Sequence, residues 1–240
     1  MVKKIHYCWF GGGEKSGLVE KCIESWRRLM PDFEIIEWNE SNFDVRRNLY
    51  TSDAYDAKKY AYVSDVARFK VLYEEGGLYF DTDVELIKPL GELLEEEAFS
   101  ALETEKYIAP GLVFWCSEAG NPIAKEALDY YDSARYLDEN GERIPLTVCN
   151  IFTDIMKRHG FEEGNCLKRL DGFTVYPIDY FCPLDDATGK LKVTKNTYAI
   201  HWYAKSWMSR RKVLRTKVTR IIHRIFGKNS LKWLKGRKKA

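Results

Sequence analysis

Asp81 and Asp83 are the side chains of this 240-residue chain whose types and spacing best suit chemistry. They flank Thr82 directly after an apolar stretch, residues 77–80, that predicts a short strand. Carboxylate oxygens are hard ligands that suit a divalent cation, and such a cation can bridge to phosphate oxygens. A diphosphate leaving group must be neutralised in this way as its bond to a sugar breaks. The Asp-Thr-Asp segment therefore predicts an enzyme that binds a nucleotide-sugar.

A second pair of charged side chains, Asp65 and Arg68, precedes this segment. They are three residues apart within residues 60–75, a stretch that predicts an amphipathic helix ending at Gly76-Gly77. Side chains at this spacing share one face of a helix. Two interpretations follow from the spacing: a structural ion pair, or a carboxylate and a guanidinium presented to sugar hydroxyls.

The elements that must position these side chains alternate between strands and helices in the first half of the chain. We expect strands over residues 3–10, 33–38, 78–81, 84–87, 98–103, 112–117 and near 173–177 and 197–202, and helices over 16–30, 60–75, 122–136 and 150–159. Such alternation predicts an α/β fold with a mostly parallel sheet. In these sheets ligands bind beyond the carboxyl ends of the strands, which is where residues 11–13 and 81–83 fall.

The composition is that of a soluble globular protein, with 45% hydrophobic and 31% charged residues. The six cysteines are widely spaced and include no Cys-x-x-Cys pair, so we expect reduced thiols in a cytosolic protein. The apolar run after Lys3 and Lys4 reaches only Phe10, so we expect no signal peptide. We also expect no transmembrane helix, because every apolar run is too short to span a bilayer.

The net charge of +2 conceals an asymmetry between the body and the tail. Residues 205–240 hold fourteen Lys and Arg and no Asp or Glu, which leaves 24 basic against 36 acidic side chains, about −12, in the first 204 residues. Apolar and basic side chains interleave over residues 208–226, as in an amphipathic helix that lies on an anionic membrane. Two alternatives stay open for residues 208–240: packing against the acidic body and, least favoured, nucleic-acid binding.

Three motifs in order carry a resemblance to a known family: HYCWFGG near the start, SDVARFKVLYEEGGLYFDTDVE in the middle and YAIHWYAKSW near the end. Together they make residues 2–207 resemble glycosyltransferase family 32, which holds bacterial capsular and surface-polysaccharide transferases. The chain is more distantly similar to the glucosyltransferase domains of large clostridial cytotoxins. The resemblance implies a GT-A type, Rossmann-like α/β domain over residues 1–207. Its mostly parallel sheet would be flanked by helices and followed by the basic amphipathic helical tail, residues 208–240.

The resemblance also implies roles for the residues that match the family's motifs. Trp9 would stack on the nucleotide base, with a core aromatic at a strand end as the alternative. Asp65 and Arg68 would hold hydroxyls of the donor sugar, with Arg68 also in reach of the phosphates. Asp83 would bind a divalent cation, Mn²⁺ or Mg²⁺, and Asp81 would contact the ribose or a metal-bound water. Asp81, Asp83 and Arg68 would thus carry the catalysis.

Two further positions near the end of the body match family motifs. Ser206 and Trp207 would close over the diphosphate, although Trp207 is equally placed to anchor at a membrane interface. Bacterial members often show two histidines where this chain has His201-Trp202. His201 is therefore the imidazole that would join Asp81 and Asp83 at the metal, with a structural histidine as the alternative.

These implications add up to an expected function with named alternatives. We expect a metal-dependent, retaining transferase that moves a hexose from a UDP-sugar to a saccharide or lipid-linked oligosaccharide in surface-polysaccharide synthesis. It would be cytoplasmic and held on the inner face of the cell membrane by residues 208–240. The alternatives are a toxin-like transferase that modifies proteins, and a non-catalytic adaptor that binds a membrane or nucleic acid.

Overall fold

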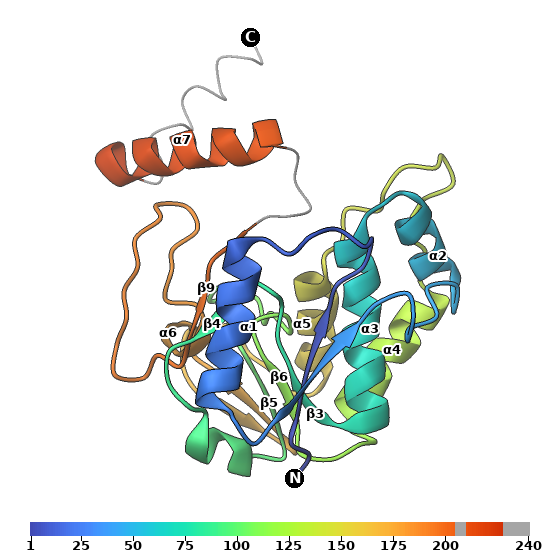
Figure 1. The fold of residues 1–240 in the computed structure, drawn as a ribbon, viewed down its shortest axis with the longest axis horizontal. Helices are drawn as coiled ribbons and strands as arrows, with labels where there is room; N and C mark the ends of the chain where they lie inside the picture. Colours follow the sequence, from blue (N-terminus) through green and yellow to red (C-terminus); the bar gives the residue numbers. More distant parts are fainter. Residues whose placement is uncertain (205–209, 228–240) are drawn as a thin grey trace.

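A seven-stranded sheet forms the centre of the computed structural model, which describes residues 1–204 and 210–227 (Figure 1). Five of the seven strands run in one direction, and β6 and β7 run the opposite way. In spatial order the strands are β2 (Glu34–Trp38), β1 (Lys4–Cys8), β3 (Gly77–Tyr79), β6 (Phe114–Cys116), β5 (Ala98–Ala101), β8 (Phe173–Tyr176) and β7 (Lys168–Leu170). The predicted α/β class with a mostly parallel sheet is confirmed.

Both faces of this sheet are buried, because successive side chains of its strands enter different core clusters. Tyr79 packs with the helices α2 (Leu49–Asp56), α3 (Tyr60–Glu75), α4 (Pro122–Ser133) and α5 (Val148–Arg158). Leu78 packs on the other face with α1 (Gly17–Leu29) and with β4 (Val84–Leu86) and β9 (Ala199–His201), which form a two-stranded sheet. Short turns of helix, η1 (Gly91–Glu95) and α6 (Ile178–Phe181), and the tail helix α7 (Arg210–Phe226) complete the described elements.

The predicted helices agree with the structure because their boundaries are coded locally. The predicted helix 60–75 coincides with α3, which ends where Gly76 adopts φ +67°. The prediction for 122–136 runs three residues too long, and α4 begins as expected with Asn121 as its cap and Pro122 in its first turn. The prediction missed β7 and α6, since the polar KRL sequence and a four-residue turn give little periodic signal.

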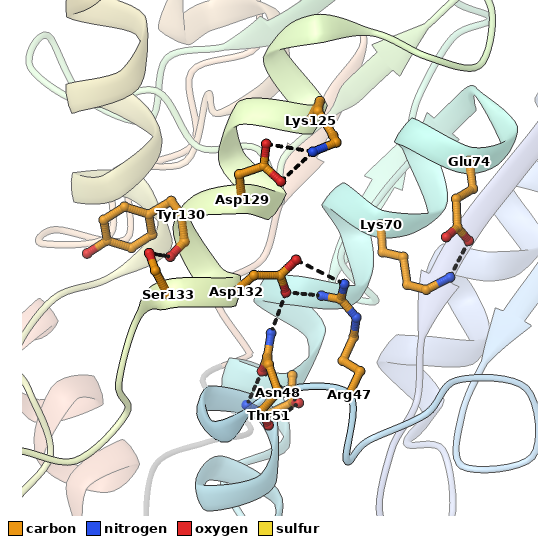
Figure 2. Close-up of polar contacts among 10 residues, drawn as sticks. All are labelled: Arg47, Asn48, Thr51, Lys70, Glu74, Lys125, Asp129, Tyr130, Asp132 and Ser133. Atoms are coloured by element: carbon orange, nitrogen blue, oxygen red, sulfur yellow. Dashed lines mark hydrogen bonds and ion pairs between the residues drawn. The ribbon is translucent and has the colours of Figure 1, made fainter.

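Polar contacts attach α2 to α4 and so steady the helical layer around α3 (Figure 2). The Asn48 side chain accepts from the Thr51 amide at 2.9 Å, which caps α2, and donates to Asp132 Oδ1 of α4 at 2.9 Å. Arg47 Nη1 lies 2.8 Å from the same Asp132 oxygen. The i, i+4 pairs Lys70–Glu74 and Lys125–Asp129 lie on the surface of α3 and α4, where ion pairs contribute little to stability.

His6 is a fully buried polar side chain in β1, next to the edge strand β2, and its hydrogen bonds fix its tautomer. Its Nδ1 accepts from Trp38 Nε1 at 3.1 Å, so the ring proton lies on Nε2, which donates to the Gly76 carbonyl at 2.9 Å. Burial lowers the pKa of His6 below its ordinary value. The ring is therefore neutral in the folded protein and protonates more readily in the unfolded chain.

This linkage predicts a stability loss on acidification that belongs to His6. The stability from the neutral ring is fully present above the unfolded pKa, near 6.5, and is lost as pH falls towards the depressed folded value. Each pH unit in that window costs up to about 1.4 kcal/mol. We expect His6→Gln, which keeps a donor and an acceptor but does not titrate, to flatten urea-derived unfolding free energies between pH 7 and pH 5. Parallel profiles for the two proteins would contradict the assignment.

Candidate active site

The predicted site residues gather at the carboxyl ends of the adjacent parallel strands β1 and β3. These strands pair with Ile5 opposite Leu78 and His6 opposite Tyr79, so the segments that follow them leave the sheet at the same edge. Trp9 follows the end of β1, and Asp81 follows the end of β3. The predicted placement of residues 11–13 and 81–83 at this edge is confirmed.

Arg68 of α3 lies at the centre of a buried polar network. Its Nη2 lies 3.0 Å from Asp65 Oδ1 and 3.1 Å from Asp81 Oδ1. Tyr79 adds a hydroxyl that donates to Asp81 Oδ1 at 3.0 Å, and its ring lies 5.0 Å from the Arg68 guanidinium. The ion pair suggested by the spacing of Asp65 and Arg68 therefore forms, and the fold adds Asp81 to it.

One guanidinium nitrogen of this network lacks a protein acceptor. Arg68 Nη1 is buried and has no hydrogen-bond partner among the described residues, and the Arg68 side chain is only 3% exposed. Asp81 is the more open member of the network, with 35% of its side chain exposed. A buried donor without an acceptor is costly unless a ligand supplies one. The site therefore suits a ligand with oxygen acceptors, such as hydroxyls or phosphate.

The charges in the network are set by burial and by neighbouring groups. Burial alone would lower the pKa of Arg68, but Asp81, Tyr79 and Asp65 raise it well above its ordinary value, so the guanidinium stays charged. Burial raises the pKa of Asp65 to about 7, although Arg68 opposes the shift. Asp65 therefore changes its charge near neutral pH, which is unusual for an aspartate.

Asp83 occupies a second, separate environment beside β9. Its Oδ1 lies 3.4 Å from His201 Nε2, and its Oδ2 accepts from the Ala204 amide at 2.8 Å. Burial would raise the pKa of Asp83, but the charge of His201 and the bonds from His201 and Ala204 lower it below its ordinary value. Burial would likewise lower the pKa of His201, and Asp83 raises it well above its ordinary value. The two side chains thus favour an ion pair.

Trp9 stands in a loop whose shape depends on glycine. Its indole Nε1 donates to the Gly13 carbonyl at 2.7 Å, and Lys15 Nζ lies 5.7 Å from the ring centroid. Gly11 has φ +89°, and a Cβ there would lie 2.2 Å from the Tyr60 ring, so only glycine fits. The loop holds Trp9 at the same edge of the sheet as Asp81, where the indole offers a face on which a ligand's aromatic ring can stack.

The donor atoms at this edge fit a divalent cation that is shared with a ligand. In residues 1–204 and 210–227, no set of three or more His, Cys, Asp and Glu side chains could hold a metal alone. Mg²⁺ sites in phosphate-transferring enzymes commonly use one or two carboxylates and complete the shell with phosphate oxygens and waters. Asp81 and Asp83 offer hard oxygens of this type, and the unpartnered Arg68 Nη1 suits the accompanying anion.

The structure brings most of the predicted site residues together, though in two groups. Asp65, Arg68 and Asp81 form one network, and Asp83 pairs with His201 in the other. That His201 ligates a metal stays a prediction. Two residues expected over the diphosphate, Ser206 and Trp207, lie outside the described residues.

Several residues at the site escaped the sequence-based predictions. Tyr79 lies in the quoted GGLYF stretch, yet nothing in its spacing indicates that its hydroxyl would reach Asp81. Gly111 approaches the same carboxylate from the loop before β6. Glu103 follows β5 and accepts from the Cys149 thiol of α5 at 3.8 Å. Only tertiary structure brings these positions together, because they come from separate loops.

Comparisons with known proteins found similarities over parts of the chain. Residues 16–100 match the family described as glycosyltransferase sugar-binding region containing DXD motif. The human alpha-1,4-N-acetylglucosaminyltransferase is 26% identical over 161 residues, which cover 65% of this chain and 41% of that protein. The chain thus spans less than half the length of this curated relative.

Two solved structures that are named as glycosyltransferases are similar to the chain. PaToxG Glycosyltransferase shares 21% identity over 65% of this chain and 68% of its own, with a TM-score of 0.48. A glycosyltransferase involved in the glycosylation of the major capsid of PBCV-1 shares 12% identity over 90% of this chain and 98% of its own, with a TM-score of 0.39. The region 16–100, which matches the glycosyltransferase sugar-binding family, holds four of the predicted site residues, Asp65, Arg68, Asp81 and Asp83.

Proposed function

We propose that the chain transfers a hexose from a nucleotide diphosphate-sugar, with a UDP-sugar as the favoured donor, to a saccharide or lipid-linked oligosaccharide. The observation that carries the proposal is Arg68, a buried guanidinium with two carboxylate partners and one nitrogen left without an acceptor at a strand edge. A donor of this class presents hydroxyls and diphosphate oxygens, either of which can accept the hydrogen bond that Arg68 Nη1 lacks. The name of the human relative makes N-acetylglucosamine a candidate sugar.

In this proposal the side chains divide the donor between them. Trp9 stacks on the base, Asp65 accepts from sugar hydroxyls, and Arg68 Nη1 donates to a hydroxyl or phosphate oxygen. Asp81 and Asp83 hold Mn²⁺ or Mg²⁺, and the cation, when bound, stabilises negative charge on the leaving diphosphate. None of the described carboxylates is assigned as a nucleophile in this proposal. We therefore favour front-face attack with retention of configuration. Product of inverted configuration by NMR would overturn that stereochemistry.

Asp65 gives the proposal a pH dependence. The ionised Asp65 side chain can only accept hydrogen bonds, and its pKa of about 7 means that acid protonates it and turns one of its oxygens into a donor. We expect kcat/KM for the donor to fall about tenfold per pH unit below pH 7. Asp65→Asn should lower kcat/KM and abolish this acid limb, since asparagine does not titrate. The check is a donor-hydrolysis profile from pH 5.5 to 9, and an acid limb that persists in Asp65→Asn would assign it to another group.

The tail is proposed to hold the enzyme on the inner, cytoplasmic face of an anionic membrane. In α7, Ile221 and Phe226 are 60% and 72% exposed, and Arg220 pairs with Asp186 of the body. Figure 1 shows α7 beyond the end of the body that lies opposite the N-terminus. No helix in the described part of the chain is both long and apolar enough to cross a membrane. Exposed apolar side chains on a basic helix suit the interface of an anionic bilayer.

Vesicle pelleting tests the tail directly. The full chain should pellet with vesicles of phosphatidylglycerol and phosphatidylcholine and lose this binding at high salt, because its electrostatic part is screened. A chain shortened to residues 1–207 should stay in the supernatant. Equal pelleting of both forms would contradict the anchoring role, and binding of the full chain to RNA but not to vesicles would favour the nucleic-acid alternative.

The proposed donor site is tested by thermal shift with UDP, GDP, CDP and ADP and with UDP-N-acetylglucosamine, in Mn²⁺, Mg²⁺ or EDTA. A ligand that binds only the native state stabilises it by about 2.7 kcal/mol at a hundredfold excess over Kd. We expect one base to stabilise the protein in metal and not in EDTA. Well-folded protein that responds to no nucleotide would favour the non-catalytic adaptor. Transfer from the identified donor to protein, but not to saccharides, would favour the toxin-like alternative.

A further inference from the structure

Three of the polar contacts to Asp83 come from one short segment at the end of β9. The Asp83 carbonyl accepts from the Trp202 amide at 2.9 Å, and the two oxygens of its side chain contact His201 and the Ala204 amide. In β4 and β9, Val84 pairs with His201, so the segment crosses directly over the residue that precedes β4. The position of the Asp83 carboxylate therefore depends on how the chain turns between His201 and Ala204.

Tyr203 makes this turn in a conformation that tyrosine rarely adopts. Its φ is +53°, and among the described residues only Lys58 is another non-glycine with positive φ. A residue with a bulky side chain is strained in this left-handed region. The turn ends the pairing after Trp202 and directs the next amide, that of Ala204, onto the side chain of Asp83. Such strain persists only where the surroundings hold it.

The side chain of Tyr203 supplies that restraint. Its hydroxyl and the Cys182 Sγ are hydrogen-bonded at 3.0 Å, and Cys182 is only 3% exposed at the end of α6. The Cys182 amide donates to the Ile178 carbonyl at 2.8 Å, so the backbone of Cys182 is held at the end of α6. On its other side the Tyr203 ring packs against His201, with ring centroids 4.0 Å apart. One side chain thus connects the body to both groups that hold the Asp83 carboxylate.

We propose that Tyr203 is a positioning residue for Asp83, anchored by Cys182, and that the pair sets the carboxylate for the cation and nucleotide. The inference rests on the proposed function of Asp83. Tyr203 acts through the Ala204 amide and His201, and has no contact with substrate of its own in this role. Residues that orient a metal ligand typically affect metal affinity by 10–100-fold when they are replaced.

The test measures Mn²⁺ affinity in the presence of UDP, from thermal shifts and from the EPR signal of free Mn²⁺. Tyr203→Phe and Cys182→Ala should each raise the apparent Kd of Mn²⁺ about tenfold. Cys182→Ser, which keeps a hydrogen-bonding group, should restore affinity close to wild type. The double variant should bind Mn²⁺ no more weakly than either single one, because both remove the same contact. The control is Tyr198→Phe, which removes a tyrosine hydroxyl just before β9 and should bind Mn²⁺ as the wild-type protein does.

Each result decides a different claim. If none of the nucleotides tested by thermal shift supports Mn²⁺ binding to the wild-type protein, the proposed donor site itself is overturned. Wild-type binding with an unchanged Kd in Tyr203→Phe would overturn only the positioning role. A lower melting temperature of Tyr203→Phe without ligand, with unchanged Mn²⁺ affinity, would also overturn it, since the contact would then serve stability alone.

Discussion

Replacing Asp83 with asparagine is expected to lower sugar transfer on the order of a thousandfold. Asparagine keeps the shape of the side chain but removes its negative charge, and a cation that stabilises the leaving diphosphate contributes several kcal/mol to the transition state. About 1.4 kcal/mol corresponds to a tenfold change in rate, so the loss of most of that contribution gives this factor. The same variant should lose the metal-dependent thermal shift with nucleotide, which separates a binding defect from a purely kinetic one.

The effect of Asp83→Asn on folding needs its own control. Asp83 has a lowered pKa, so its charge stabilises the folded state above the unfolded pKa, and its removal should lower the melting temperature. Asp129→Asn, which removes an exposed carboxylate that contacts Lys125 at 2.6 Å on α4, should leave both activity and the nucleotide shift unchanged. Transfer by folded Asp83→Asn at the wild-type rate would refute the role of Asp83, and with it the metal-dependent part of the proposed mechanism.

The sequence alone predicts the elements whose signals are local. Residues 60–75 carry their periodicity and end at a glycine pair, and the helix agrees with α3 at both ends. The edge at which Trp9 and Asp81 meet was also predictable. Both follow apolar strands in an alternating α/β pattern, and ligands in such folds bind beyond the carboxyl ends of the strands. Periodicity, glycine stops and topology rules therefore account for the place of the site.

The contacts within the site could not be predicted, because they join residues that are far apart in the chain. The spacing of Asp65 and Arg68 allows an ion pair, but the Arg68–Asp81 contact depends on how α3 packs against β3. The Ala204 amide reaches Asp83 only through the left-handed turn at Tyr203. No single-sequence signal marks a tyrosine for positive φ, since the preference of the residue is the opposite. The sequence thus predicted the edge of the sheet at which Trp9 and Asp81 lie, but not the contacts that the site residues make.

Gly111 offers the sharpest test of this packing, and Gly111→Ala is expected to reduce transfer about a hundredfold. A Cβ at this position would lie 2.0 Å from Asp81 Oδ2 and 3.0 Å from Arg68 Nη1. The Gly111 carbonyl accepts from the Asp81 amide at 2.8 Å, so the two backbones cannot simply move apart. Asp81 must instead rotate and break its bonds to Arg68 and Tyr79. A displacement of about 1 Å in a reacting geometry can cost a hundredfold in rate.

The mechanism of this loss is tested by removing the side chain with which the new methyl group collides. In an Asp81→Ala background, Gly111→Ala should cost little further activity, because the contact at 2.0 Å no longer exists and Arg68 Nη1 can shift slightly. Gly17→Ala is the matched control: a Cβ at Gly17, the first residue of α1, meets no atom within 4 Å, and alanine favours a helix. That variant should keep full activity and an equal or higher melting temperature.

Three outcomes distinguish the explanations. If the losses from Gly111→Ala and Asp81→Ala add independently, Gly111 acts elsewhere. If Gly111→Ala keeps its activity, the position of the Asp81 side chain tolerates change. Non-additive losses would instead tie the activity to the Arg68–Asp81 network, whose geometry depends on the missing side chain at Gly111.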